Sequence, residues 1–176
     1  MSGHNKWSKI KNKKAVTDSK KSKVFSKFAK LITMESKTVS GDINSPSLKS
    51  AIDQAKAVNM PADNITRAVK KGMGADAGSM EAITYEAYGP GGCAMIIECL
   101  TDSKNRTAAE IRHTLSKNNL ALAGIGSVVW GFEKKENKWI PNTMLSLSDE
   151  DMEKAEKVID ELEDNDEVQE VFTNIE

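Results

Sequence analysis

Lysines and one tryptophan gather at the start of the chain in a pattern that suits contact with nucleic acid. Within residues 3–14, five lysines surround Trp7. An indole ring can stack on an exposed base while neighbouring ammonium groups follow the phosphate backbone, and stacking contributes roughly 1 to 3 kcal/mol per base. Two other interpretations stay open: a solvated terminal tail, or an indole that joins the core together with Ile10.

The charge of the chain is divided between its two halves, although its net charge is only −1 at pH 7. Residues 1–72 contain sixteen Lys or Arg against five Asp or Glu, whereas residues 73–176 contain nine basic and twenty-one acidic residues. This division is typical of a basic module that binds a polyanion beside an acidic module that does not. Phosphate binding of this kind follows from counterion release and weakens as salt rises.

The basic residues of the first half are the candidate nucleic-acid contacts. Almost all are lysines, which supply charge more readily than bidentate base contacts, so we expect a reader of shape and backbone on ribosomal RNA or duplex DNA. The lysines of the first long helix should cover its solvent side. Arg67, Lys70 and Lys71 either extend this basic surface or complement the dipole at the C-terminal end of a later helix. The candidates are His4, Lys6, Trp7, Lys9, Lys11, Lys13, Lys14, Lys20, Lys21, Lys23, Lys27, Arg67, Lys70 and Lys71.

Two further stretches are candidates for a cleft or partner contact. The glycine-rich stretch 88–92 is either a simple hairpin turn or a loop whose backbone approaches a partner closely. The polar residues near position 104 stand where a strand gives way to a helix, so they either cap that helix or face a cleft between domains. The candidate contacts are Tyr88, Gly89, Pro90, Gly91, Gly92, Asp102, Asn105 and Arg106.

Catalytic and metal-binding patterns are missing from the sequence. His4 and His113 have no cysteine, carboxylate or second histidine at ligand spacing, which argues against a metal site. Glu98 and Asp102 come nearest to an acid–base pair, but nothing else in the sequence supplies a substrate pocket. We therefore expect a non-enzymatic protein with no catalytic residue, no cofactor, no metal and no small-molecule substrate.

The sequence also lacks the signals of a membrane or secreted protein. It contains no run of about 18 apolar residues and no apolar signal segment at its start, so we expect a cytoplasmic protein without a membrane partner. Cys93 and Cys99 share one face of an expected strand but lie too far apart along it to form a disulfide. They should be buried thiols.

The first half predicts three short helices. Apolar residues recur at three- and four-residue steps over roughly residues 18–37, which indicates one amphipathic helix. Ser45 and Pro46 are typical of the start of a second helix, and Pro61 opens a third that Gly72 can end in a left-handed conformation. The glycine-rich stretch that follows lacks the flanks of a phosphate-binding loop, and it predicts a linker.

The second half changes to an apolar period of two, which is typical of strands. Strands are expected over residues 83–88, 93–100, 127–132, 139–147 and 168–175, with one helix that begins after residue 102 or 105 and another after residue 148. The order β-β-α-β-β-α-β predicts an α+β fold, in which a ferredoxin-like (split βαβ) sandwich carries its helices on one face of a mainly antiparallel sheet. The expected units are a basic helical domain (1–72), a linker (73–80) and an acidic α+β domain (81–176).

Five spaced motifs resemble the YebC/PmpR family, to which the mitochondrial translational activator of cytochrome c oxidase belongs. The resemblance covers nearly the whole chain. It implies a non-enzymatic cytoplasmic regulator of gene expression, either a DNA-binding transcriptional regulator or a ribosome-associated translation factor that relieves stalling, with its domains arranged around a cleft. The motifs are Gly3-His-Asn-Lys-Trp7, Asn59-Met-Pro61, Tyr88-Gly-Pro-Gly-Gly92, Glu98-Cys-Leu-Thr-Asp102 with Asn105-Arg-Thr107, and Gly126-Ser-Val128.

The chain departs from the family pattern at one place. Typical members insert a third domain between two strands of the second half, whereas here residues 132–141 join those strands by a tight hairpin. The chain is therefore identified as a short member that lacks this domain. An alternative from another class is a protein-interaction adaptor whose basic N-terminus is incidental.

Overall fold

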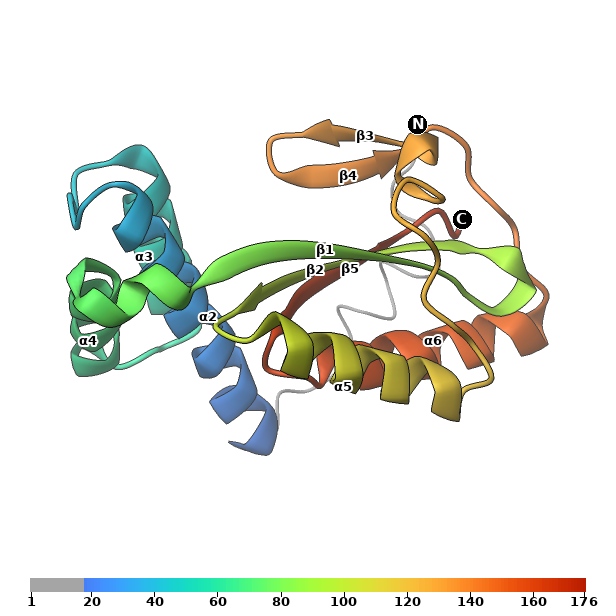
Figure 1. Ribbon diagram of the computed structural model, residues 1–176, viewed down its shortest axis with the longest axis horizontal. Helices are drawn as coiled ribbons and strands as arrows, with labels where there is room; N and C mark the ends of the chain where they lie inside the picture. Colours follow the sequence, from blue (N-terminus) through green and yellow to red (C-terminus); the bar gives the residue numbers. More distant parts are fainter. Residues whose placement is uncertain (1–17) are drawn as a thin grey trace.

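The chain folds into a group of helices followed by a part that combines strands and helices (Figure 1). The structure is a computed structural model and describes residues 18–176. Its α+β class and its order of strands and helices confirm the expectation from the sequence. The elements are α2 (Asp18–Thr38), α3 (Pro46–Ala57), α4 (Ala62–Met73), η1 (Ala75–Ser79), β1 (Glu81–Tyr88), η2 (Pro90–Gly92), β2 (Ala94–Thr101), α5 (Lys104–Lys117), η3 (Val129–Gly131), β3 (Phe132–Lys135), β4 (Lys138–Pro141), α6 (Asp149–Glu163) and β5 (Val168–Thr173).

Helices α2, α3 and α4 share a small core of their own, to which Ile32 and Leu48 contribute fully buried side chains. Gly72 does not end α4 in a left-handed conformation, as its type had predicted, because the helix continues to Met73. Gly72 is buried instead, and a Cβ atom there would lie only 2.5 Å from the carbonyl oxygen of Thr33. A glycine is therefore required for the close approach of α4 to α2.

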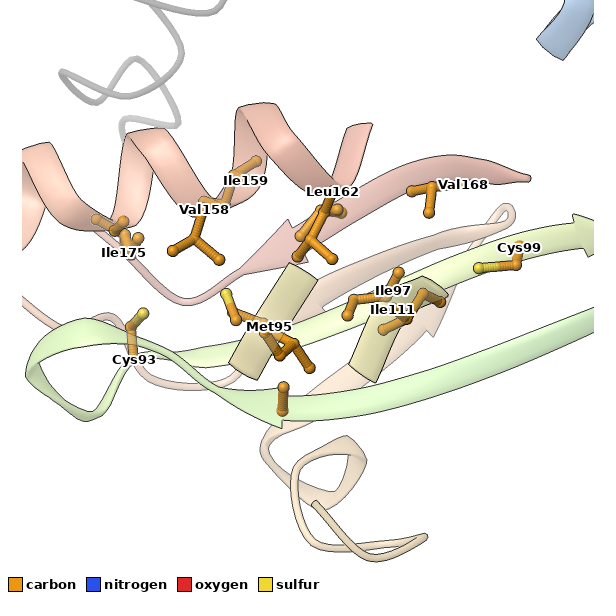
Figure 2. Packing of buried hydrophobic residues seen from close by; sticks show 14 of the residues in the cluster. Cys93, Met95, Ile97, Cys99, Ile111, Val158, Ile159, Leu162, Val168 and Ile175 are labelled. Atoms are coloured by element: carbon orange, nitrogen blue, oxygen red, sulfur yellow. The ribbon is translucent and has the colours of Figure 1, made fainter. Parts of the chain in front are cut away.

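The main sheet is antiparallel with the strand order β1-β2-β5, and α5 and α6 cover one of its faces (Figure 1). Side chains of β2, β5 and both helices meet in the largest core cluster, part of which Figure 2 shows. Cys93 and Cys99 are buried in this cluster without a disulfide. Burial raises the pKa of Cys93 to about 11 and that of Cys99 to about 12, so both are protonated thiols at neutral pH.

The other face of the sheet is partly covered by the β3–β4 hairpin, which forms a two-stranded sheet of its own (Figure 1). Ile96 of the main sheet packs against Val128 and Phe132 in a third, smaller core cluster. The hairpin turns through Glu136 and Asn137, which both have positive φ, as expected for a tight two-residue turn. The strand expected over residues 127–132 is wrong, because β3 begins only at Phe132 and the preceding residues form η3.

The carboxylate of Glu86 explains why residues 126–129 do not form a strand. It is buried and accepts hydrogen bonds from the backbone N–H groups of Gly126, Val128 and Val129 at 2.7, 2.6 and 2.9 Å. These donors are consequently unavailable to a neighbouring strand. Burial alone raises the pKa of Glu86, but the three donors outweigh that effect and hold the pKa below its ordinary value.

We expect Glu86→Gln to lower the free energy of unfolding by about 2 kcal/mol at neutral pH, because an uncharged amide oxygen accepts these hydrogen bonds more weakly. A carboxylate whose pKa is lowered on folding stabilises the protein above its unfolded pKa, and this contribution is lost as the pH falls through the folded pKa. The difference between wild type and variant should therefore shrink below about pH 4. Urea denaturation of both proteins at several pH values measures this difference in the free energy of unfolding.

Glu133→Gln is the matched control, because Glu133 is exposed and its carboxylate only pairs with Lys135 at the surface. This control should change the free energy of unfolding by less than about 0.5 kcal/mol. Equal effects of the two substitutions at every pH would contradict the organising role of Glu86.

Candidate nucleic-acid interface

Four lysines of α2 contact the second half of the chain: Lys37 donates to the carbonyl oxygens of Gly78 and Met80, and three others meet the turn between α6 and β5. The expectation that they cover the solvent side of the helix is wrong for Lys23, Lys27 and Lys30, which share one face of α2 at spacings of four and three residues. That face meets the turn between α6 and β5, where the α6 carbonyl groups attract cations. The contacts are an ion pair between Lys23 and Asp164 at 2.6 Å, a hydrogen bond from Lys27 Nζ to the carbonyl oxygen of Glu163, and one from Lys30 Nζ to the carbonyl oxygen of Asp166 at 3.1 Å.

Glu167 is the centre of this junction. Its side chain is only 9% exposed, and its Oε1 atom accepts Lys30 Nζ at 3.0 Å and Arg106 Nη2 at 2.7 Å. Burial raises the pKa of Glu167, but the hydrogen bonds and charges of Lys30 and Arg106 outweigh that effect and keep the pKa below its ordinary value. A single carboxylate thus joins α2, α5 and the start of β5.

The polar residues at the start of α5 lie at this junction. Arg106 also pairs with Asp102, at 2.8 Å. Ser103 occupies the N-cap position of α5, so neither Asp102 nor Asn105 takes that place. Asn105 is exposed in the first turn. Asp102 therefore does not cap the helix, and neither Asp102 nor Arg106 lines the cleft between the two parts.

The glycine-rich stretch 88–92 lies at the opposite end of the β1–β2 pair (Figure 1). The two strands of eight residues separate it from Asp102 by about 25 Å. Gly91 has a φ of 65°, and a Cβ atom there would lie 2.6 Å from Leu147. The stretch is a 3-10 turn packed near the start of α6, and the structure does not bring the two sets of candidate contacts together.

A cleft of about 840 Å³ lies between α2 and α3, the edge of the main sheet that the β3–β4 hairpin leaves open, and the hairpin itself. Its apolar lining includes Phe28 and Leu31 of α2. Its charged lining is mixed in sign, so the cleft is not a continuous positive channel of the kind that follows a phosphate backbone. The charged residues that line it are Lys27, Glu35, Glu98, Lys134, Glu136, Lys138 and Glu170.

The lysines left for solvent lie elsewhere on the helices. Lys20, Lys49, Lys56 and Lys70 are exposed and form no ion pair with any residue of 18–176. Lys49 and Lys56 were not among the candidates, although their seven-residue spacing on α3 would have placed them on one helix face. Of the candidates, Lys21 and Lys71 are also exposed, and Arg67 donates to Asn64 and Asp63 of its own helix. His4, Lys6, Trp7, Lys9, Lys11, Lys13 and Lys14 lie outside the described residues.

The described residues hold no group of three or more His, Cys, Asp or Glu side chains arranged to bind a metal ion. Among the helices between residues 18 and 176, none is both long and apolar enough to cross a bilayer.

We expect Glu167→Ala to destabilise the protein by about 3 kcal/mol, because it leaves Lys30 and Arg106 at a partly buried junction without their shared carboxylate. Asp164→Ala removes an exposed partner of Lys23 from the same turn and should cost less than about 1 kcal/mol. Thermal unfolding of both variants provides the comparison. A Glu167 variant as stable as the Asp164 variant would show that the ion contacts at Glu167 do not hold the two parts together.

Comparison with known proteins covers almost the whole chain. The family model described as the TACO1/YebC protein N-terminal domain matches residues 5–75. The model described as the TACO1/YebC second and third domain matches residues 80–137 and 132–175. The probable transcriptional regulatory protein GSU1074 of Geobacter sulfurreducens is 39% identical over 235 residues, which cover 99% of this chain and 95% of that protein. The probable transcriptional regulatory protein TTE1135 of Caldanaerobacter subterraneus is 37% identical over 239 residues, which cover 100% and 98%.

A solved structure is also similar along the full length. The crystal structure of a conserved hypothetical protein, Aq1575 from Aquifex aeolicus, superposes with a TM-score of 0.85 at 28% identity and covers 98% of this chain and 97% of that one. The alignment with the Geobacter protein contains about sixty positions without a counterpart in the 176 residues of this chain. The two matches to the second family model meet at residues 132–137, which places these missing positions at the β3–β4 hairpin. The chain belongs to the TACO1/YebC family, as a short member with a tight hairpin at this point.

Proposed function

We propose that this protein is a non-enzymatic, nucleic-acid-binding regulator of gene expression that contacts phosphate backbones with its basic first half. The observation that carries the proposal is the division of charge, with an excess of eleven positive charges in residues 1–72 and of twelve negative charges in residues 73–176. Counterion release from phosphates makes such an excess sufficient for binding. Curated relatives carry the name probable transcriptional regulatory protein, which supports a regulatory role.

Three lysines of α2 are less available for phosphate contact than the sequence suggests. Lys23, Lys27 and Lys30 are engaged at the junction with the second half, so they contribute little to an open basic face. On the described surface the exposed lysines of α3 and α4 remain, and the sequence has five further lysines in residues 3–14. We therefore propose that the segment around Trp7 supplies the main contact and that α3 and α4 extend it.

Lysine-rich surfaces recognise backbone and shape rather than sequence. This favours a structured RNA such as ribosomal RNA, while duplex DNA stays the competing target. Co-sedimentation with ribosomes that weakens with salt, without preference among duplex DNA sequences, is expected for a translation factor. Selective binding to particular duplexes at physiological salt, without ribosome binding at low salt, would instead establish a DNA-binding transcriptional regulator.

Reversing the charge of Lys11, Lys13 and Lys14 to glutamate should weaken binding to ribosomes and to random duplex DNA at least tenfold at low salt. Each lost phosphate contact lowers the slope of log affinity against log salt by about 0.7 to 0.9, so we expect a slope reduced by roughly two. Salt titrations of both binding reactions measure these changes.

The matched control reverses Lys135, Lys138 and Lys157, which changes the net charge equally but lies in the second half. It should alter affinity by less than about twofold. Equal losses in the two triple variants would mean that overall charge, rather than the basic segment, drives binding. Unchanged activity of the first variant in cells would support an adaptor whose basic N-terminus is incidental.

Trp7→Ala tests base stacking separately from charge. If Trp7 stacks on a base, affinity for single-stranded or looped RNA should fall by about 1 to 3 kcal/mol while the salt slope stays the same. Ile140→Ala is the control, since Ile140 is an exposed apolar side chain of β4 in the second half, at 45%. A loss below this range for Trp7→Ala in a folded protein would exclude the stacking role.

A further inference from the structure

An uncharged surface surrounds the short helical turn η3. Residues 118–132 contain no Asp, Glu, Lys or Arg, although 29% of the whole chain is charged. Ile125 is fully exposed, at 102% of its reference area, and Trp130 is 76% exposed. Tyr88 and Met144, at 46% and 44%, are large exposed side chains of two segments that are hydrogen-bonded to this loop. We call Tyr88, Ile125, Trp130 and Met144 the apolar loop surface.

Hydrogen bonds connect Tyr88, Trp130 and the segment before Met144 to the same loop. The Tyr88 hydroxyl and the Trp130 Nε1–H both donate to the carbonyl oxygen of Ser127, at 2.7 and 2.8 Å. The backbone N–H of Asn142, two residues before Met144, donates to the carbonyl oxygen of Gly131 at 2.8 Å. The polar atoms of both rings are thus satisfied within the loop, and their apolar parts face outward without a hydrogen-bonding demand.

The loop is also held in one conformation before any partner arrives. The buried Glu86 carboxylate fixes the backbone N–H groups of Gly126, Val128 and Val129. A fixed loop loses little conformational freedom when it binds, and exposed Trp and Tyr side chains are the types that contribute most to protein interfaces. Stacking on nucleic acid is disfavoured here, because residues 118–132 offer no cation for a phosphate.

We propose that the apolar loop surface is a self-association site, at which a second copy of this chain docks by two-fold symmetry. In a two-fold contact each patch faces its own copy, so a charged patch would repel itself whereas this neutral one does not. If each side chain has a full surface of about 200 Å², the patch exposes on the order of 500 Å². Two such patches bury about 1,000 Å², which suits a weak, transient dimer.

The apolar loop surface lies where a second copy of the chain can reach it. Relatives carry about sixty additional positions at the adjacent β3–β4 hairpin, while here the hairpin closes directly and no described residue covers the patch. The root of the hairpin and η3 lie away from α3 and α4 in Figure 1. A dimer formed at this surface leaves both basic helical parts free, and two linked binding modules gain affinity through effective concentration.

Sedimentation velocity of the full chain over micromolar to millimolar concentration tests the proposal. The mean mass of the wild type should rise toward twice the monomer mass, and Ile125→Asp should stay monomeric because it places two carboxylates against each other. Ile125→Ser, which adds no charge beside Glu86, should weaken the dimer about tenfold through lost apolar area. Ile43→Asp is the matched control, since Ile43 is 59% exposed between α2 and α3, and it should associate like the wild type.

The dependence of dimer formation on salt distinguishes an apolar contact from an electrostatic one. An apolar dimer persists or strengthens as sodium chloride rises, whereas a dimer formed between the basic and acidic ends of two copies dissociates. A wild type that is monomeric at every concentration, a dimer that dissolves in salt, or Ile125 variants that associate as tightly as the wild type would each overturn the proposal.

Discussion

One buried carboxylate, that of Glu167, connects the two parts of this protein. It accepts Lys30 from the first helix and Arg106 from the start of α5, and it lies in a turn whose carbonyl groups bind further lysines of α2. A buried charge is tolerated only when its partners remain in place. The position of the helical part against the sheet, and the cleft between them, therefore depend on this set of contacts.

Because of these contacts, the basic and acidic halves are not simply two separate charged surfaces. A sequence with a basic first half and an acidic second half suggests two separate surfaces, but part of each charge is used to hold the halves together. Attraction between oppositely charged parts within the chain lowers the charge presented to nucleic acid. Exposed lysines of α3 and α4 remain on the described surface, and the proposal adds the five lysines that the sequence has in residues 3–14.

A second buried carboxylate, Glu86, has a comparable effect within the acidic half. By binding three backbone N–H groups it converts an expected strand into a fixed loop, and the loop displays Ile125 and Trp130 to solvent. The two proposed surfaces are of opposite character, one cationic and salt-dependent and the other neutral and apolar. Contacts made on α3 and α4 need not disturb the apolar loop surface, because η3 lies away from these helices (Figure 1).

Local patterns in the sequence were sufficient for the helix over Asp18–Thr38, the start of α3 at Pro46, the order of strands and helices, and the burial of Cys93 and Cys99. Each depends on residues a few positions apart, whose spacing is read directly. Only the tertiary structure decided which lysines stay exposed, because Lys27 meets a carbonyl group 136 positions away. The sequence likewise did not decide that β3 and β4 form a separate sheet, or that Gly72 permits the close packing of α4 on α2. Both features arise from contacts between distant segments, which no local pattern records.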